Sequence, residues 1–164
     1  ALALLHDRSS NQANYKGLPL LVCAGGGPLS RSERRWIAGY GLENSVMQLQ
    51  ADDPVLAWLY RHAEAVLVPS LAEGFSLPLI EALACDTPII ASDLEVHREV
   101  GQRYATLLPA LNAQAWAERL AADEGITERP SRKLGAQSYE LLRSHYSPER
   151  LVEEHLMAYC CIKT

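Results

Sequence analysis

The stretch VLVPSLAEGFSLPLIEALACDTPIIASD, residues 66–93, decides how this chain folds. It begins within a short apolar run, residues 65–68, which is bounded by a proline and is typical of a buried parallel strand. After a polar loop, residues 77–85 predict an apolar helix with Pro78 at its first position, where proline loses no helical hydrogen bond. Residues 88–91 predict a second strand. Because such crossovers are right-handed, we expect the two strands to lie side by side in one parallel sheet.

Two carboxylates belong to this unit, Glu73 in the loop and Glu81 in the helix, with seven residues between them. Glu81 has apolar neighbours along the helix, and a buried carboxylate is costly without a partner, so it requires a hydrogen-bond donor. The loop over residues 70–77 should lie at the carboxyl ends of the strands, where such sheets bind ligands. Free amides at the start of the helix favour an anion. Sugar hydroxyls beside a diphosphate, as in a nucleotide-sugar, would satisfy this set of groups.

The remaining chain continues the alternation of strands and helices. Glycines Gly25 and Gly26 end the first apolar run and allow either a simple turn or a close approach of a ligand, although the G-x-G-x-x-G spacing is absent. Asp86, after the central helix, is expected in a left-handed conformation. Ser30 with Glu33 predicts a capping box, and Asn112 predicts a helix cap. The alternation predicts an α/β fold, a Rossmann-like parallel sheet with helices on both faces. Strands are expected at residues 20–24, 45–50 and 104–108, and helices at 1–7, 30–40, 55–63 (started by Asp52 or Asp53), 95–100, 112–122, 131–146 and 148–161.

Composition narrows the classes of protein. A chain of 164 residues with 48% hydrophobic residues fits one globular domain. Its net charge of −5 gives no basic field, so we expect no nucleic-acid partner. No apolar run approaches the ~20 residues of a membrane helix. The four cysteines and five histidines lack metal-ligand spacing, so we expect no metal site.

Residues 73–93, EGFSLPLIEALACDTPIIASD, resemble the E-x7-E signature of retaining glycosyltransferases of family 4 (group 1), which have the two-domain GT-B architecture. The usual pattern is PSxxEGFGLPxxEAMACGxPVIASD, so the similarity is long and contiguous. The resemblance implies that residues 1–164 are a single nucleotide-sugar-binding domain, the C-terminal half of a longer enzyme. The chain begins in mid-pattern without a methionine, which is typical of an N-terminally truncated piece.

The same resemblance implies roles for particular residues. Glu73 would be the catalytic position and would accept hydrogen bonds from the donor sugar, and Glu81 would accept those of the ribose. Ser76 stands where glycine is common and could narrow the pocket or contribute a hydroxyl. The full donor-binding set would be Glu73, Gly74, Phe75, Ser76, Leu77 and Glu81, together with Gly25 and Gly26.

The implied activity is hexose transfer in polysaccharide biosynthesis, with mannose from GDP-mannose preferred and without a metal or other cofactor. The acceptor, a saccharide or a lipid-linked saccharide, would bind through an N-terminal domain. The implied location is the cytoplasm, with peripheral contact at the inner face of the plasma membrane. The family's basic loop, which neutralises the leaving diphosphate, is missing before Leu20, so we expect no sugar transfer by this chain alone. The alternatives are a non-catalytic GT-B-derived module for nucleotide binding or assembly and, less similar, a nucleotide-sugar epimerase.

Overall fold

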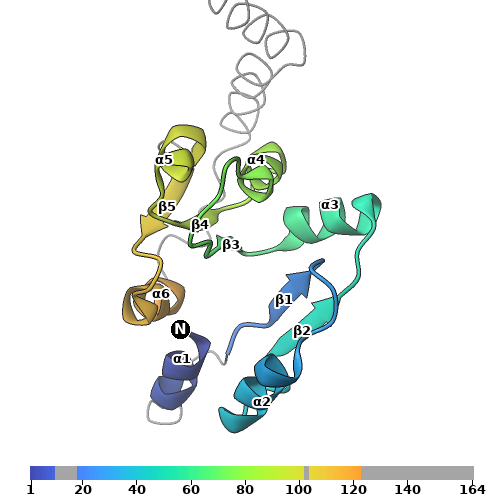
Figure 1. Ribbon diagram of the computed structural model, residues 1–164, viewed down its shortest axis with the longest axis vertical. Coiled ribbons are helices and arrows are strands. Elements are labelled where there is room, and N and C mark those ends of the chain that lie inside the picture. The colour runs from blue at the N-terminus through green and yellow to red at the C-terminus, as the bar shows by residue number, and fades with distance from the viewer. Residues whose placement is uncertain (10–17, 102–103, 123–164) are drawn as a thin grey trace, which may run out of the picture.

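The computed structural model describes residues 1–9, 18–101 and 104–122 (Figure 1). The expected helices at 131–146 and 148–161 lie outside this described part. The helices are α1 (Leu2–Ser9), α2 (Arg31–Gly39), α3 (Asp53–His62), α4 (Leu77–Ala84), α5 (Glu95–Gly101) and α6 (Ala113–Ala121). The strands are β1 (Leu21–Ala24), β2 (Val46–Leu49), β3 (Val66–Val68), β4 (Ile89–Ser92) and β5 (Ala105–Leu108).

All strand pairs are parallel among the described residues, which confirms the predicted α/β class. The strands form two sheets, however, rather than the single sheet expected from the sequence. One sheet has the order β1-β2 and the other β3-β4-β5. Figure 1 shows the two sheets as separate groups, with α3 leading from one to the other. Strands β1 and β3 do not pair with each other, and residues of both line an apolar cleft.

Helix starts are set by side chains that satisfy the first free amides. Ser30 and Glu33 form the predicted capping box of α2, in which the backbone N–H of Ser30 donates to Glu33 Oε2 at 2.6 Å. Asp52 caps α3 by accepting from the backbone N–H of Val55 at 3.0 Å. Asn112 caps α6 in the same way, as predicted.

Helix α4 begins at Leu77, so Pro78 is its second residue and not its first. Its end is closed by the backbone bonds Asp86 N to Leu83 O at 3.1 Å and Thr87 N to Ala82 O at 3.0 Å. This is a Schellman ending, which requires a left-handed residue after the cap. Asp86 has φ 57°, which confirms the expected left-handed conformation at this position.

The core lies where α4 and α5 pack on the three-stranded sheet. Strand β4 is buried along its whole length, as a central strand covered on both faces should be. This packing fixes the end of β3, the start of α4 and the end of β4, which are the elements around the predicted site. The buried cluster is made of Val68, Leu79, Ala82, Leu83, Ile89, Ala91 and Val100.

Candidate functional site

Glu73 lies in the loop between β3 and α4, and both of its carboxylate oxygens have polar partners nearby. The hydroxyl of Ser70 donates to Oε1, and the Nε2 atom of His97 on α5 lies 3.2 Å from Oε2. The side chain of Glu73 remains 19% exposed. The carboxylate is therefore held in place while part of it still faces solvent.

The pKa of Glu73 reflects these contacts. Burial alone would raise the pKa of Glu73, but its interactions with Ser70, Ser76 and His97 lower it by more, so the pKa lies below its ordinary value. Ser76 is fully buried, and its hydroxyl influences Glu73 although it makes no hydrogen bond of normal geometry. The side chain of Ser76, which stands where glycine is common, thus lies inside the protein.

His97 is the member of this group that the sequence reasoning missed. Its side chain is completely buried, and its Nδ1 atom lies 2.7 Å from the backbone carbonyl oxygen of Ser92, at the end of β4. It lies 24 positions from Glu73, so no local pattern joins the two residues. The available signal was a lone histidine in the short helix EVHREVG, where charged residues flank it in the sequence.

Glu81 has the donor that its apolar surroundings required. The hydroxyl of Tyr60 on α3 donates to Glu81 Oε2 at 2.8 Å, in a partly buried position. Burial and, second, the bond to Glu81 raise the pKa of Tyr60 well above its ordinary value. Glu73 and Glu81 therefore contact different elements, α5 and α3, and no hydrogen bond joins the two acids within the described chain.

The other predicted donor-binding residues surround the start of α4. Phe75 and Leu77 are 48% and 58% exposed, and Gly74 is exposed as well. The backbone N–H of Leu77 donates to the carbonyl oxygen of Phe75 at 3.2 Å, so this amide already has a partner. The roles of these residues toward a donor stay predictions.

Gly25 and Gly26 end β1 with φ angles of 79° and 71°, which only glycine adopts without strain. The backbone N–H of Gly25 still donates to Leu49 O at 3.2 Å and extends the pairing with β2. A Cβ atom added at either glycine would meet no atom within 4 Å, so the space directly beside them is open. The structure thus shows the sharp turn, and the approach of a ligand stays a prediction.

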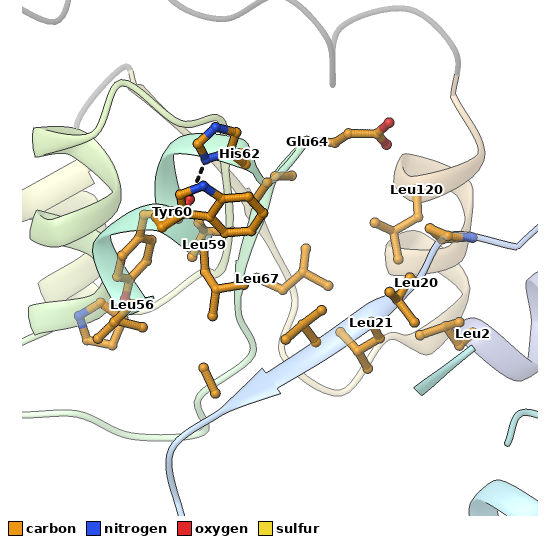
Figure 2. A pocket seen from close by; sticks show the side chains of 18 residues that line it. Leu2, Leu20, Leu21, Leu56, Leu59, Tyr60, His62, Glu64, Leu67 and Leu120 are labelled. Carbon is orange, nitrogen blue, oxygen red and sulfur yellow. Dashed lines mark hydrogen bonds between the residues drawn. The ribbon is translucent and has the colours of Figure 1, made fainter. Parts of the chain in front are cut away.

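A cleft of about 660 Å³ lies between β1, α3 and β3 (Figure 2). Figure 2 shows leucines from several elements converging on it, among them Leu21, Leu59 and Leu67, and Tyr60 lines it too. Neither Glu73 nor Glu81 belongs to its lining. We do not assign an anionic ligand to this cleft, because its walls are mainly apolar.

Two features are absent from the described residues, 1–9, 18–101 and 104–122. No described helix has both the length and the apolar character to cross a bilayer. No cluster of three or more metal-ligating side chains occurs among the same residues.

Parallel strands joined by helices, with a held carboxylate where a strand ends, define a Rossmann-like α/β domain with a candidate ligand site at the sheet edge. Comparison with known sequence families defines the class of this domain more narrowly. The chain belongs to the family described as "Glycosyl transferases group 1", whose sequence model matches residues 8–132.

Curated relatives carry names of the same kind. The chain is 34% identical over 151 residues to a D-inositol 3-phosphate glycosyltransferase of Jonesia denitrificans, covering 85% of this chain and 34% of the relative. It is 33% identical over 101 residues to the O-antigen chain mannosyltransferase RfbU of Salmonella typhimurium, covering 56% of this chain and 29% of the relative. The chain therefore spans about a third of the length of these relatives.

Solved structures support the fold. Sucrose-phosphate synthase from Thermosynechococcus elongatus superimposes with a TM-score of 0.69 at 26% identity, covering 98% of this chain and 41% of that one. TarM superimposes with a TM-score of 0.70 at 19% identity, covering 94% of this chain and 31% of TarM, which is evidence for the fold alone.

Proposed function

We propose that this chain is the C-terminal, nucleotide-sugar-binding domain of a retaining GT-B glycosyltransferase of family 4. The longer enzyme transfers a hexose from a nucleotide-sugar to a saccharide or lipid-linked acceptor in polysaccharide biosynthesis. Membership of the group 1 family and the names of the relatives support glycosyl transfer. The partial coverage of those relatives supports a role as one domain of two.

The observation that carries the proposal is the arrangement around Glu73. A carboxylate has about four lone-pair positions, and Ser70 and His97 occupy one on each oxygen. The remaining positions can accept hydroxyl hydrogens, and the 19% exposure of the side chain leaves a route to them. An ionised carboxylate that is fixed at a strand end, with acceptor capacity left over, suits a polyhydroxylated ligand.

The rest of the donor is distributed around this anchor. Glu81 accepts the ribose hydroxyls through Oε1, since Tyr60 occupies Oε2. The diphosphate lies at the loop of Gly74, Phe75, Ser76 and Leu77 before α4, and Gly25 and Gly26 lie beside it in the open turn after β1. No metal is required by this set of groups.

GDP-mannose is our proposed donor, because mannosyltransferases occur among the relatives. The acceptor binds through the N-terminal domain of the longer enzyme, which works in the cytoplasm at the inner face of the plasma membrane. The basic residues that neutralise the leaving diphosphate belong to a part of the longer enzyme that the 164-residue chain does not contain. The 164-residue chain by itself is therefore expected to transfer no sugar.

Calorimetric titration of the full-length enzyme with GDP, UDP and ADP, followed by transfer assays with the matching sugars, tests the proposal. For the unaltered enzyme, tight binding of GDP and transfer of mannose are expected. For Glu73→Gln, kcat/KM should fall about ten- to hundred-fold, because the substitution neutralises one charged hydrogen-bond acceptor. Glu99→Gln, an exposed position on α5, is the matched control. Binding of nucleotide without any transfer would favour a non-catalytic module, and a Glu73→Gln enzyme with unchanged kcat/KM would refute the assigned role.

A further inference from the structure

The buried imidazole of His97 lies between two hydrogen-bond acceptors. Nδ1 lies 2.7 Å from the carbonyl oxygen of Ser92, and Nε2 lies 3.2 Å from Glu73 Oε2. The ring has no exposed surface, so water cannot complete its hydrogen bonding from outside. Its protonation state must therefore fit these two partners.

The two partners impose different requirements on the ring. A backbone carbonyl oxygen can only accept, so Nδ1 must carry a hydrogen to make the bond to Ser92. An ionised carboxylate also only accepts, so Nε2 must carry a second hydrogen to bond Glu73. In a neutral imidazole with its hydrogen on Nδ1, the lone pair of Nε2 would face the carboxylate of Glu73. Two hydrogen-bond acceptors would then face each other inside the protein without a hydrogen between them, which is costly.

We propose that His97 is a buried imidazolium whose ion pair with Glu73 keeps that carboxylate ionised and oriented at the end of β3. His97 is thus a positioning residue, with Ser92 O fixing the ring from one side so that Nε2 meets Glu73 on the other. The inference rests on the proposed function of Glu73 for its catalytic consequence, but the ion pair itself can be observed without any substrate.

The surrounding charges are consistent with this pairing. Asp93, next to Ser92, forms a two-fold hydrogen bond with Arg98 at 2.6 and 2.8 Å, so these two neighbours satisfy each other at the surface. Glu95 and Glu99 of α5 are exposed. Glu81, from α4, is directed to Tyr60. Within the described residues, Glu73 is the carboxylate in contact with His97 and balances its charge.

The first test reads the ring directly, by NMR of the full-length protein labelled with ¹⁵N at histidine. At neutral pH, His97 should show two protonated ring nitrogens with hydrogens that exchange slowly with water. In Glu73→Gln, the side-chain amide can donate to Nε2, so His97 should lose its second hydrogen and become neutral. A neutral ring in the unaltered protein, or an imidazolium that persists in Glu73→Gln, would overturn the proposal.

The second test separates positioning from a general structural role. His97→Asn keeps a donor near Ser92 but none that reaches Glu73, whereas His97→Gln keeps a donor that reaches Glu73 but no charge. We expect kcat/KM for the sugar donor to fall about ten- to hundred-fold in His97→Asn and by less in His97→Gln, as expected for loss of a hydrogen bond to a charged group. Affinity for GDP alone should stay unchanged, since GDP lacks the sugar that Glu73 holds.

His62→Asn is the matched control for these variants. His62 also lies in a helix with Nδ1 2.7 Å from a backbone carbonyl oxygen, that of Trp58, but it is exposed and contacts no carboxylate in the described part of the chain. Equal losses of GDP and GDP-mannose affinity in His97→Asn would show a structural role and refute positioning. If the unaltered enzyme binds no nucleotide-sugar, the proposed function fails, while the NMR result still decides the ion pair.

Discussion

The same substitution, glycine to alanine, should have opposite effects at two helix ends of this protein. Gly101 ends α5 and is buried, and a Cβ atom there would lie 2.9 Å from the Cβ of Ala105 and 3.5 Å from Leu79 Cδ1. Gly39 ends α2 and is exposed, with no atom within 4 Å of an added Cβ. Neither glycine has a positive φ, so alanine is compatible with both backbones.

The magnitudes follow from these distances. At both positions alanine gains about 0.5–1 kcal/mol, because it loses less conformational freedom on folding than glycine. At Gly101 the contact of 2.9 Å with Ala105 forces α5 away from β5, and overpacking of this kind costs about 1–3 kcal/mol. We therefore expect Gly101→Ala to lower the free energy of unfolding by about 1 kcal/mol (range about 0–2.5 kcal/mol), and Gly39→Ala to raise it by up to about 1 kcal/mol.

Urea unfolding followed by tryptophan fluorescence measures both changes, with the buried Trp116 as a reporter of the core. Unchanged slopes with shifted midpoints would show that stability, rather than the extent of unfolding, has changed. A Gly101→Ala protein as stable as Gly39→Ala would refute the close approach of α5 and β5.

Three further outcomes are expected. Contacts lower the pKa of Glu73 in the folded protein, so ionised Glu73 stabilises the fold fully above its ordinary pKa of 4.5, and this stabilisation is lost as the pH falls through the lower folded-state pKa. Glu73→Gln should therefore flatten the decline of the free energy of unfolding below about pH 4.5 in acid titrations. An unaltered decline would contradict this. Tyr60→Phe removes the donor to Glu81 and should cost about 1–2 kcal/mol in urea unfolding, whereas no loss would show that water replaces the phenol. Asp86→Gly relieves a left-handed residue and should raise stability by about 0.5–1 kcal/mol, with a measured loss contradicting the strain.

Features that depend on neighbouring residues could be predicted from the sequence. The caps Ser30 and Asn112 and the left-handed Asp86 were all predicted correctly, because each depends on backbone groups a few positions away. The requirement of Glu81 for a donor was also predicted. The identity of that donor was not, since Tyr60 lies 21 positions earlier on another helix.

Pairings across the chain could not be predicted in the same way. The contact between Glu73 and His97 depends on how α5 packs beside the end of β3, and no periodicity records that arrangement. The division of the strands into two sheets was missed for a related reason. Apolar runs predict which segments are strands, but they do not determine which edges meet.

The open inner edges of β1 and β3 affect how this protein behaves at high concentration. An unpaired strand edge is a template on which an extended segment of another molecule can add, and this is a common start of aggregation. Here the edges are short, four residues in β1 and three in β3. Pro19 lies just before β1 and Pro69 directly after β3, and proline has no N–H with which to lengthen a ladder. The two prolines therefore limit how far a foreign strand could add to either of these two edges.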